Sequence, residues 1–404
     1  MSREASRLPK TGAGGWNDHC LSVGEEISMQ LFCVKPKVHC IDTFAAFAAE
    51  FALGPRDLLL TETFLYERFI KAAGLSCPII LKDKYDAGEP KEETVDQILA
   101  DMQPFPIDRV VAVGGGSVID IAKVLIIRDA RPIGRIIRGE QPFETDKQLI
   151  ILPTTCGTGS EVTFGGIITM KDTGLKTAIM DERLSADHAV LVPELVAELP
   201  IKFFIHCSVD ALGHSMESYV SAARGNEMAR AVGARAVQLI LNGYRQLIEK
   251  GAAYKALLAK DFIQASCLAG MAVNNGGAGP VHALAYPLGE KYKISHGESI
   301  YQFLTAVFSI YDQIRPEGAL AELKDIVEKP LQEAGFAGEA PVFERLEKML
   351  NQLYPNRPLR ETGMTEQDIK PFTESIFASK QRLLVASYVP FTREQAAEIY
   401  RRRF

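Results

Sequence analysis

Short apolar runs alternate with longer amphipathic segments between residues 55 and 200. Runs that end at a glycine, a proline or a polar turn are typical of buried strands. Five such runs are DLLLTE from Asp57, PIILK from Pro78, RVVAVGGG from Arg109, QLIILPTT from Gln148 and AVLVP from Ala189, and a sixth strand-like run, MQLFCV, starts at Met29. Residues 94–102 and 118–128 have helical spacing. This alternation predicts a parallel sheet with helices on both faces.

The pattern changes after Pro200. Apolar residues then recur every three or four positions over 203–222, 228–250 and 253–275, and again over 316–355, 365–386 and 393–402. Runs of β-branched residues are few there, so helices are expected throughout. The sequence therefore predicts an α/β fold, with an N-terminal parallel-sheet domain over residues 29–200 and an all-helical domain over 201–404. Residues 1–28, rich in glycine, serine and charge, are expected to form a tail.

Composition narrows the class of protein. A net charge of -6 argues against nucleic acid or an anionic membrane as a partner, because either would favour a basic face. We find no apolar run that reaches the ~18 residues of a membrane-spanning helix. The seven cysteines are scattered, and the N-terminus lacks the order of a secretory signal. Both features favour a reducing, cytoplasmic location.

A glycine turn joins one predicted strand to a helix. It consists of Gly114, Gly115, Gly116 and Ser117. Glycines let the backbone approach a pyrophosphate, and the start of the helix offers free N–H groups and the positive end of the dipole. The turn is not the GxGxxG fingerprint, and a purely structural turn is the alternative interpretation.

A second loop, over residues 154–161, follows the next predicted strand and carries Thr154, Thr155 and Thr158 among its glycines. Its hydroxyl groups and close backbone suit a phosphate and a ribose, although an ordinary solvated connection is the alternative. Two such loops at the carboxyl ends of strands in one sheet predict a nucleotide site. Glu62 follows another strand, where a carboxylate would bind ribose hydroxyls and repel a 2′-phosphate, which favours NAD over NADP. A carboxylate that only stabilises a helix start is the other interpretation of Glu62.

A carboxylate and three imidazoles form a candidate metal site in the helical half. The candidate ligands are Asp210, His214, His282 and His296. The first two lie at positions i and i+4 of a predicted helix and so share one face. Such a set suits a divalent ion with room for a substrate oxygen. Taken singly, each residue also fits a different role: a surface hydrogen-bonded pair, a buried structural histidine or a catalytic base. Glu217, one turn beyond His214 and on roughly the same side, is expected either to resemble a ligand in the sequence without binding the ion or to support a ligand, and His188 and His206 are expected to be structural.

These motifs together resemble the iron-dependent (group III) alcohol dehydrogenases. The matching segments are GGGSVIDIAK at 114–123, PTTCGTGSEVT at 153–163, DALGHSMESY at 210–219, and HALAYPLG and SHG within 282–297. The resemblance covers roughly residues 30–404 and implies a nucleotide-binding domain, a helical metal domain and a cofactor between them. It implies the same four metal ligands, with Fe²⁺ as the ion and Zn²⁺ as the alternative, and a homodimer or larger homo-oligomer.

The resemblance also implies a set of contacts with NAD. These fall on Gly115, Gly116, Ser117, Thr154, Thr155, Thr158, Thr163 and Lys176. Asp120 matches the motif too, although a carboxylate in the first turn can equally stabilise its own helix. Many members carry a second histidine four residues after the third metal ligand, and this chain has Tyr286 there. The family's usual proton relay is therefore in doubt, and Tyr286 is expected to shape the pocket, to orient the substrate or only to pack.

Within the family, stretches such as CSVDAL, RPLRETGM and QRLLVASYVPFTRE resemble the 4-hydroxybutyrate dehydrogenase subgroup. A substrate with a carboxylate needs a cation at the far end of the pocket, and an arginine can bind it through two hydrogen bonds. Arg382 is the first candidate, followed by Arg360 and Lys291, although Arg382 on a solvated helix face or in an ion pair is an equal alternative. The rival functions are another short-chain alcohol or diol dehydrogenase, a non-redox enzyme similar to dehydroquinate synthase, and a nucleotide-binding module without catalysis.

Overall fold

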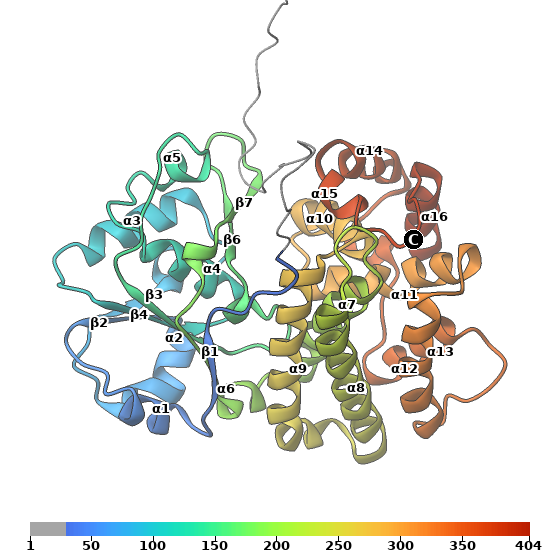
Figure 1. Ribbon diagram of the computed structural model, residues 1–404, viewed down its shortest axis with the longest axis horizontal. Coiled ribbons are helices and arrows are strands. Elements are labelled where there is room, and N and C mark those ends of the chain that lie inside the picture. The colour runs from blue at the N-terminus through green and yellow to red at the C-terminus, as the bar shows by residue number, and fades with distance from the viewer. Residues whose placement is uncertain (1–29) are drawn as a thin grey trace, which may run out of the picture.

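The structure, a computed structural model, describes residues 30–404 and consists of two halves that lie side by side (Figure 1). The expected tail of residues 1–28 lies outside the described residues. The first half contains the strands and a few short helices. Its strands are β1 Lys37–Cys40, β2 Asp57–Thr61, β3 Ile79–Leu81, β4 Arg109–Gly114, β5 Gln148–Pro153, β6 Gly165–Thr169, β7 Lys176–Met180 and β8 His188–Leu191. Its helices are α1 Phe44–Glu50, α2 Thr63–Leu65, α3 Glu92–Met102, α4 Gly116–Leu125, α5 Ile133–Ile137 and α6 Pro193–Ala197.

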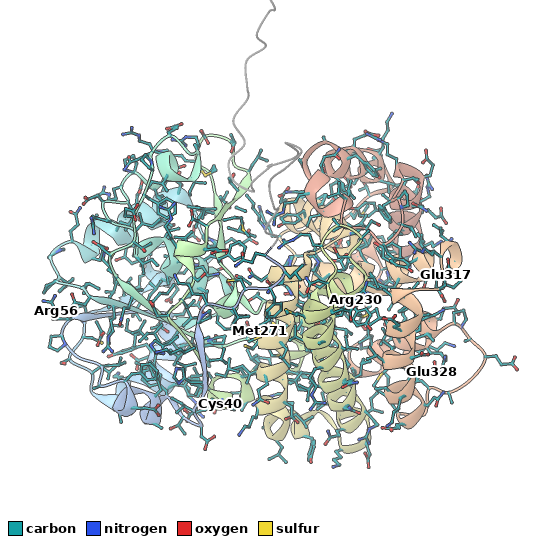
Figure 2. The ribbon with its side chains drawn as sticks, in the orientation of Figure 1. Cys40, Arg56, Arg230, Met271, Glu317 and Glu328 are labelled. Atoms are coloured by element: carbon teal, nitrogen blue, oxygen red, sulfur yellow. The ribbon has the colours of Figure 1, made fainter. Side chains whose placement is uncertain are left out.

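The second half is helical, as the sequence predicts. Its helices are α7 Ile201–Val220, α8 Glu227–Lys250, α9 Lys255–Gly276, α10 Pro280–Tyr292, α11 His296–Ile314, α12 Ala319–Glu333, α13 Val342–Leu353, α14 Ile369–Ser379, α15 Gln381–Leu384 and α16 Arg393–Arg403. Figure 2 shows side chains from both halves at their boundary, where Met271 of α9 lies.

Six strands form one parallel sheet in the order β1-β8-β5-β4-β2-β3. Alternate residues of β4 enter different cores: Val110 and Ala112 pack with the helices α3 and α4, and Val111 and Val113 pack with α1 on the other face. Because both faces are covered, the strands are apolar along their whole length rather than alternating. The predicted parallel sheet is confirmed.

The prediction of a strand that starts at Met29 is wrong. Residues 30–35 form no strand, and the edge strand β1 begins at Lys37. The backbone of Cys33 is bonded elsewhere: its N–H donates to Oδ1 of Asn275 at 2.6 Å, and its carbonyl accepts from Nδ2 of Asn275 at 3.1 Å. Asn275 lies on α9, so this segment connects the two halves instead of extending the sheet.

An antiparallel hairpin of β6 and β7 was not expected from the sequence. It packs against α4, and its first strand begins with two glycines. A Cβ atom at Gly165 would lie 2.2 Å from Sδ of Met180, and one at Gly166 would lie 3.2 Å from the carbonyl oxygen of Asp120. The hairpin can therefore approach its neighbours closely only because these two positions lack side chains.

The helices α7, α8 and α9 form the centre of the second half and pack against one another. Nearly all of α7 from Phe204 to Val220 is buried. Within the described residues, the stretch Ala252–Gly276 has the length and the apolar composition of a membrane span, and 56% of its most apolar window is buried inside the protein. This stretch contains α9, so packing in the core accounts for its apolar residues.

Candidate active site

Three loops meet at the carboxyl edge of the sheet because β2, β4 and β5 are neighbours. Glu62 follows β2, the glycine turn follows β4, and Thr154 follows β5 and donates its N–H to the carbonyl of Gly114 at 3.1 Å. The turn is close to the threonine loop: a Cβ atom at Gly115 would lie 3.4 Å from Thr155 Cγ2, and one at Gly116 would lie 3.3 Å from Thr158 Cγ2. The start of α4 is partly buried and has no side-chain cap, so its free N–H groups form a cradle that suits a pyrophosphate.

Glu62 occupies the N-cap position of α2, but its side chain makes no capping hydrogen bond. Burial raises the pKa of Glu62, while the nearby charge of Lys82 opposes that shift. The carboxylate of Glu62 therefore does not stabilise the start of α2 through a capping hydrogen bond. Its position beside the glycine turn agrees with the binding of a ribose hydroxyl.

Three other predicted cofactor residues bind the protein itself. The Asp120 carboxylate accepts hydrogen bonds from the backbone N–H of Ile167 at 3.0 Å and from Ser160 Oγ at 3.1 Å, and so joins α4 to the hairpin. The hydroxyl of Thr163 accepts a hydrogen bond from Nζ of the buried Lys123 at 2.9 Å. Lys176 forms an ion pair with Glu89 at 2.7 Å. These contacts give Asp120, Thr163 and Lys176 structural functions that the sequence did not reveal.

The threonine loop also contacts the helical half. A Cβ atom at Gly157 would lie 2.8 Å from the carbonyl oxygen of Cys207 on α7. Gly159 has a left-handed backbone (φ +58°), and a Cβ atom there would lie 2.4 Å from the Cα of Gly270 on α9. This close packing places the cradle next to the α7 segment that carries Asp210.

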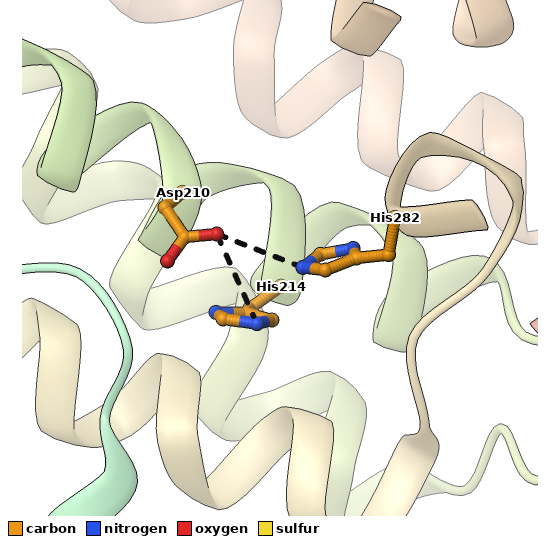
Figure 3. A group of neighbouring side chains, drawn as sticks. All are labelled: Asp210, His214 and His282. Carbon is orange, nitrogen blue, oxygen red and sulfur yellow. Dashed lines mark ion pairs between the residues drawn. The ribbon is translucent and has the colours of Figure 1, made fainter. Parts of the chain in front are cut away.

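The four predicted metal ligands come together at this boundary. Asp210 Oδ1 lies 3.6 Å from His282 Nε2, 3.5 Å from His296 Nε2 and 4.0 Å from His214 Nε2. Figure 3 shows Asp210 and His214 of α7 and His282 of α10 converging. Asp210, His214 and His282 are buried, whereas His296 at the start of α11 is partly open to solvent.

The donor set fits a divalent ion. Among residues 30–404, Asp210 Oδ1 and His282 Nε2 are buried and have no hydrogen-bond partner. Burial of such atoms is costly unless something satisfies them, and their separations are too long for hydrogen bonds. One carboxylate oxygen and several imidazole nitrogens are ligands that Fe²⁺ and Zn²⁺ accept.

The charges in the group also favour a cation. Burial alone would raise the pKa of Asp210, but the neighbouring imidazoles outweigh burial and hold that pKa well below its usual range. Burial lowers the pKa of His214 to about 3. Burial acts in the same direction on His282, but Glu217 and Asp210 outweigh it and raise the pKa of His282 to about 9. Two buried carboxylates thus draw positive charge into the site, which a bound metal ion would supply.

Glu217 contacts His282 rather than the centre of the group. Its Oε2 lies 2.5 Å from His282 Nδ1 and accepts the N–H of Gly279 at 2.9 Å, while Oε1 accepts the N–H of Val281 at 2.6 Å. These bonds fix the ring of His282 with Nε2 toward Asp210. The two histidines that the sequence predicts to be structural have other contacts: His188 pairs with His39 at 2.9 Å, and His206 packs edge-on against Tyr354.

Tyr286 lies one helical turn after His282, and its ring centroid is 6.4 Å from that of His296. Arg382, on α15, is exposed, but its charge acts on Tyr286. The two other cations considered from the sequence have partners: Lys291 forms an ion pair with Asp368, and Arg360 donates to the carbonyl of Phe404 at 2.7 Å. Sequence reasoning missed Lys380, whose Nζ lies 3.9 Å from the centroid of the Tyr286 ring. Its only signal was its place two residues before Arg382.

Comparison with known proteins agrees with this geometry. Residues 37–193 match the family profile described as iron-containing alcohol dehydrogenase, and residues 204–404 match the C-terminal part of the Fe-containing alcohol dehydrogenase family. The chain is 39% identical over 376 residues to 4-hydroxybutyrate dehydrogenase of Clostridium kluyveri, covering 93% of this chain and 100% of that protein. It is 31% identical to long-chain-alcohol dehydrogenase 1 of Geobacillus thermodenitrificans, covering 78% and 80%.

Solved structures share the fold. A sulfoacetaldehyde reductase from Bifidobacterium kashiwanohense in complex with NAD⁺ superposes with a TM-score of 0.78 at 20% identity, covering 93% of this chain and 99% of that one. A 1,3-propanediol oxidoreductase superposes with a TM-score of 0.77 at 23% identity, covering 93% and 100%. At these identities the likeness concerns the fold alone.

Proposed function

The chain belongs to the iron-containing alcohol dehydrogenase family, and we propose that it interconverts 4-hydroxybutyrate and succinate semialdehyde with NAD at a single divalent ion. The observation that carries this proposal is the convergence of Asp210, His214, His282 and His296 beside the two cofactor loops. We propose Fe²⁺ as the ion, with Zn²⁺ as the alternative that the same ligands accept.

The proposed reaction converts the primary alcohol to an aldehyde: NAD⁺ takes the hydride to become NADH, and the hydroxyl proton is released to water. A divalent ion bound at the site would supply Lewis acidity, which favours loss of the alcohol's proton near neutral pH. The protein's own residues position the ion's ligands and the cofactor. Glu217 holds the His282 ring in place, and the Asp210 carboxylate adds negative charge on the same side. The loops after β4 and β5 would hold the pyrophosphate at the start of α4, and Glu62 would bind the ribose.

Several features support the finer parts of the proposal. The proposed substrate is supported by the 39% identical 4-hydroxybutyrate dehydrogenase, which the chain matches along that relative's whole length. NAD rather than NADP follows from Glu62 beside the cradle. Arg382 is a candidate contact for the substrate's carboxylate, because its charge acts on Tyr286 at the edge of the metal group. The six cysteines among residues 30–404 are all free, which supports the cytoplasmic location, and we retain the homodimer or larger homo-oligomer as part of the proposal.

The proposal is tested by net formation of NADH after anaerobic loading with Fe²⁺. We compare 4-hydroxybutyrate with 1-butanol and 1,4-butanediol, which have the same number of carbons and no carboxylate. A preference for the acid of tenfold or more in kcat/KM is expected, equivalent to ~1.4 kcal/mol in the transition state. A higher kcat/KM with butanol or the diol would instead show that the enzyme acts on uncharged alcohols. Conversion of a substrate without accumulation of NADH would indicate a non-redox enzyme.

A further inference from the structure

Two cations at the edge of the candidate active site, Lys380 and Arg382, form no ion pair among the residues that the structure describes. Lys380 lies between α14 and α15, and Arg382 lies on α15. Within residues 30–404 neither side chain takes part in an ion pair, whereas the nearby Lys176 pairs with Glu89 and Lys291 pairs with Asp368. Lys380 is half-buried, so its ammonium group has lost part of its water without gaining a carboxylate.

Tyr286 connects Lys380 to the metal group. The ammonium nitrogen of Lys380 lies 3.9 Å from the centroid of the Tyr286 ring, a distance at which the electrons of the ring attract a cation. The same ring lies 6.4 Å from the ring of His296, whose Nε2 is 3.5 Å from Asp210 Oδ1. The Tyr286 ring therefore contacts Lys380 and lies near His296 of the metal group.

Arg382 adds positive charge on the same side. Its charge acts on Tyr286 and on Arg224, in the turn after α7. The N–H of Ala222 in that turn donates to the carbonyl of Ala386 at 3.2 Å, so the turn and the segment after α15 are adjacent. Arg224 itself donates to the carbonyl of Asn274 at 3.1 Å.

The surrounding charges do not neutralise Lys380. Burial lowers the pKa of Lys380, and the charge of Lys176 acts in the same direction. Glu290 is the carboxylate whose charge opposes this shift, but it forms no ion pair with Lys380 within the described chain. Lys176 is paired with Glu89. An anion bound beside Lys380 would supply the missing partner.

We propose that Lys380, held against the Tyr286 ring, is the main binding residue for the carboxylate of a short ω-hydroxy acid, and that Arg382 makes a second, outer contact. This proposal rests on the proposed function, because it supplies the far end of the pocket for the same substrate. In an extended four-carbon ω-hydroxy acid the hydroxyl and carboxylate oxygens are separated by roughly 6 Å at ~1.5 Å per bond, which is long enough for the chain to lie along the Tyr286 ring. Lys380 would attract the carboxylate as a point charge, and the exposed Arg382 could add two parallel hydrogen bonds.

The test uses Lys380→Gln, with Lys370→Gln as the matched control, because Lys370 is exposed on α14, the helix that ends just before Lys380. Binding of succinate, a four-carbon dicarboxylate without an alcohol, is measured by calorimetry on the metal-loaded enzyme with NAD⁺. The Kd should rise at least tenfold in Lys380→Gln and less than twofold in Lys370→Gln. Arg382→Gln should weaken succinate binding by a smaller factor than Lys380→Gln.

A kinetic measurement distinguishes the loss of carboxylate binding from a general loss of activity. The ratio of kcat/KM for 4-hydroxybutyrate to that for 1-butanol should fall at least tenfold in Lys380→Gln, mainly through KM for the acid. An unchanged succinate Kd, or equal losses for the two alcohols, would overturn the carboxylate site. If the unaltered enzyme prefers butanol while succinate binding still depends on Lys380, the proposed substrate fails and the carboxylate site stands.

Discussion

The Nδ1 atom of His282 lies 2.5 Å from Oε2 of Glu217, and both side chains are buried. A histidine that binds a metal through one ring nitrogen usually donates its other N–H to a carboxylate, which fixes the orientation of the ring. Two backbone N–H groups in turn hold the Glu217 carboxylate in place. Glu217 therefore fixes the orientation of the His282 ring through Nδ1, so that Nε2 faces Asp210.

Glu217→Gln should weaken metal binding about 10- to 100-fold, because the amide cannot accept a hydrogen bond from His282 with the strength of a carboxylate. The affinity is measured by competition with a chelator of known strength. Glu227→Gln, at the exposed start of α8, is the control for the loss of a charge. A metal affinity within twofold of the unaltered protein would show that Glu217 does not support a ligand.

Glu62→Gln should raise the ratio of kcat/KM with NADP to kcat/KM with NAD by about tenfold, because the amide no longer repels a 2′-phosphate. Both cofactors are assayed with the same alcohol at saturating concentration. The control is Glu67→Gln, which removes an exposed carboxylate paired with Lys71 in the same segment. Equal use of both cofactors by the unaltered enzyme would remove the basis for this assignment.

Tyr286→Phe should change kcat/KM less than about threefold and leave the pH profile unaltered between pH 6 and 10. Burial raises the pKa of Tyr286 above its usual ~10, so the hydroxyl stays protonated in this range and does not act as a base. Tyr286→Ala should cost more than tenfold, since it removes the ring that Lys380 packs on. A large loss in Tyr286→Phe together with a shifted pH optimum would instead indicate proton transfer by the phenol.

Folding stability should depend on pH through His206, which is buried and packs against Tyr354. Burial lowers the pKa of His206 from 6.5 to about 4. Between these values the unfolded chain binds the proton and the folded chain does not. The stabilisation is therefore complete above pH 6.5 and is lost as the pH falls toward 4, by at most ~3 kcal/mol.

His206→Phe should flatten this dependence. Denaturant unfolding is measured at several pH values between 7.5 and 4 for both proteins. The free energy of unfolding of the unaltered protein should fall more steeply below pH 6.5 than that of the variant. Parallel curves would show that His206 takes up its proton equally in the folded and unfolded states.

The sequence predicted the parallel sheet well, because strands buried on both faces read as uninterrupted apolar runs. It failed at β1, since the bonds of Cys33 to Asn275 depend on a helix more than 200 positions away in the chain. It also missed the β6–β7 hairpin, whose glycines matter only through their contacts with Met180 and Asp120.

The part of the candidate site that lies on one helix could be predicted from the sequence, and the part that depends on tertiary packing could not. Asp210 and His214 share a helix face, so their spacing carries information about geometry. His282 and His296 join them only through the packing of α10 and α11 on α7, which spacing alone does not contain. Lys380 was missed because its position on the Tyr286 ring is a tertiary contact between α10 and the start of α15.

The central claim is that Asp210, His214, His282 and His296 hold the catalytic ion. It is tested most directly by anaerobic titration with Fe²⁺, measuring bound iron per chain and NADH formation from 4-hydroxybutyrate in the same samples. The unaltered enzyme and a His39→Ala control should each bind one iron per chain and gain activity in proportion. His282→Ala should retain its fold by circular dichroism, bind iron at least 100-fold more weakly and form no NADH above background. Full iron content and full turnover in His282→Ala would contradict the assignment.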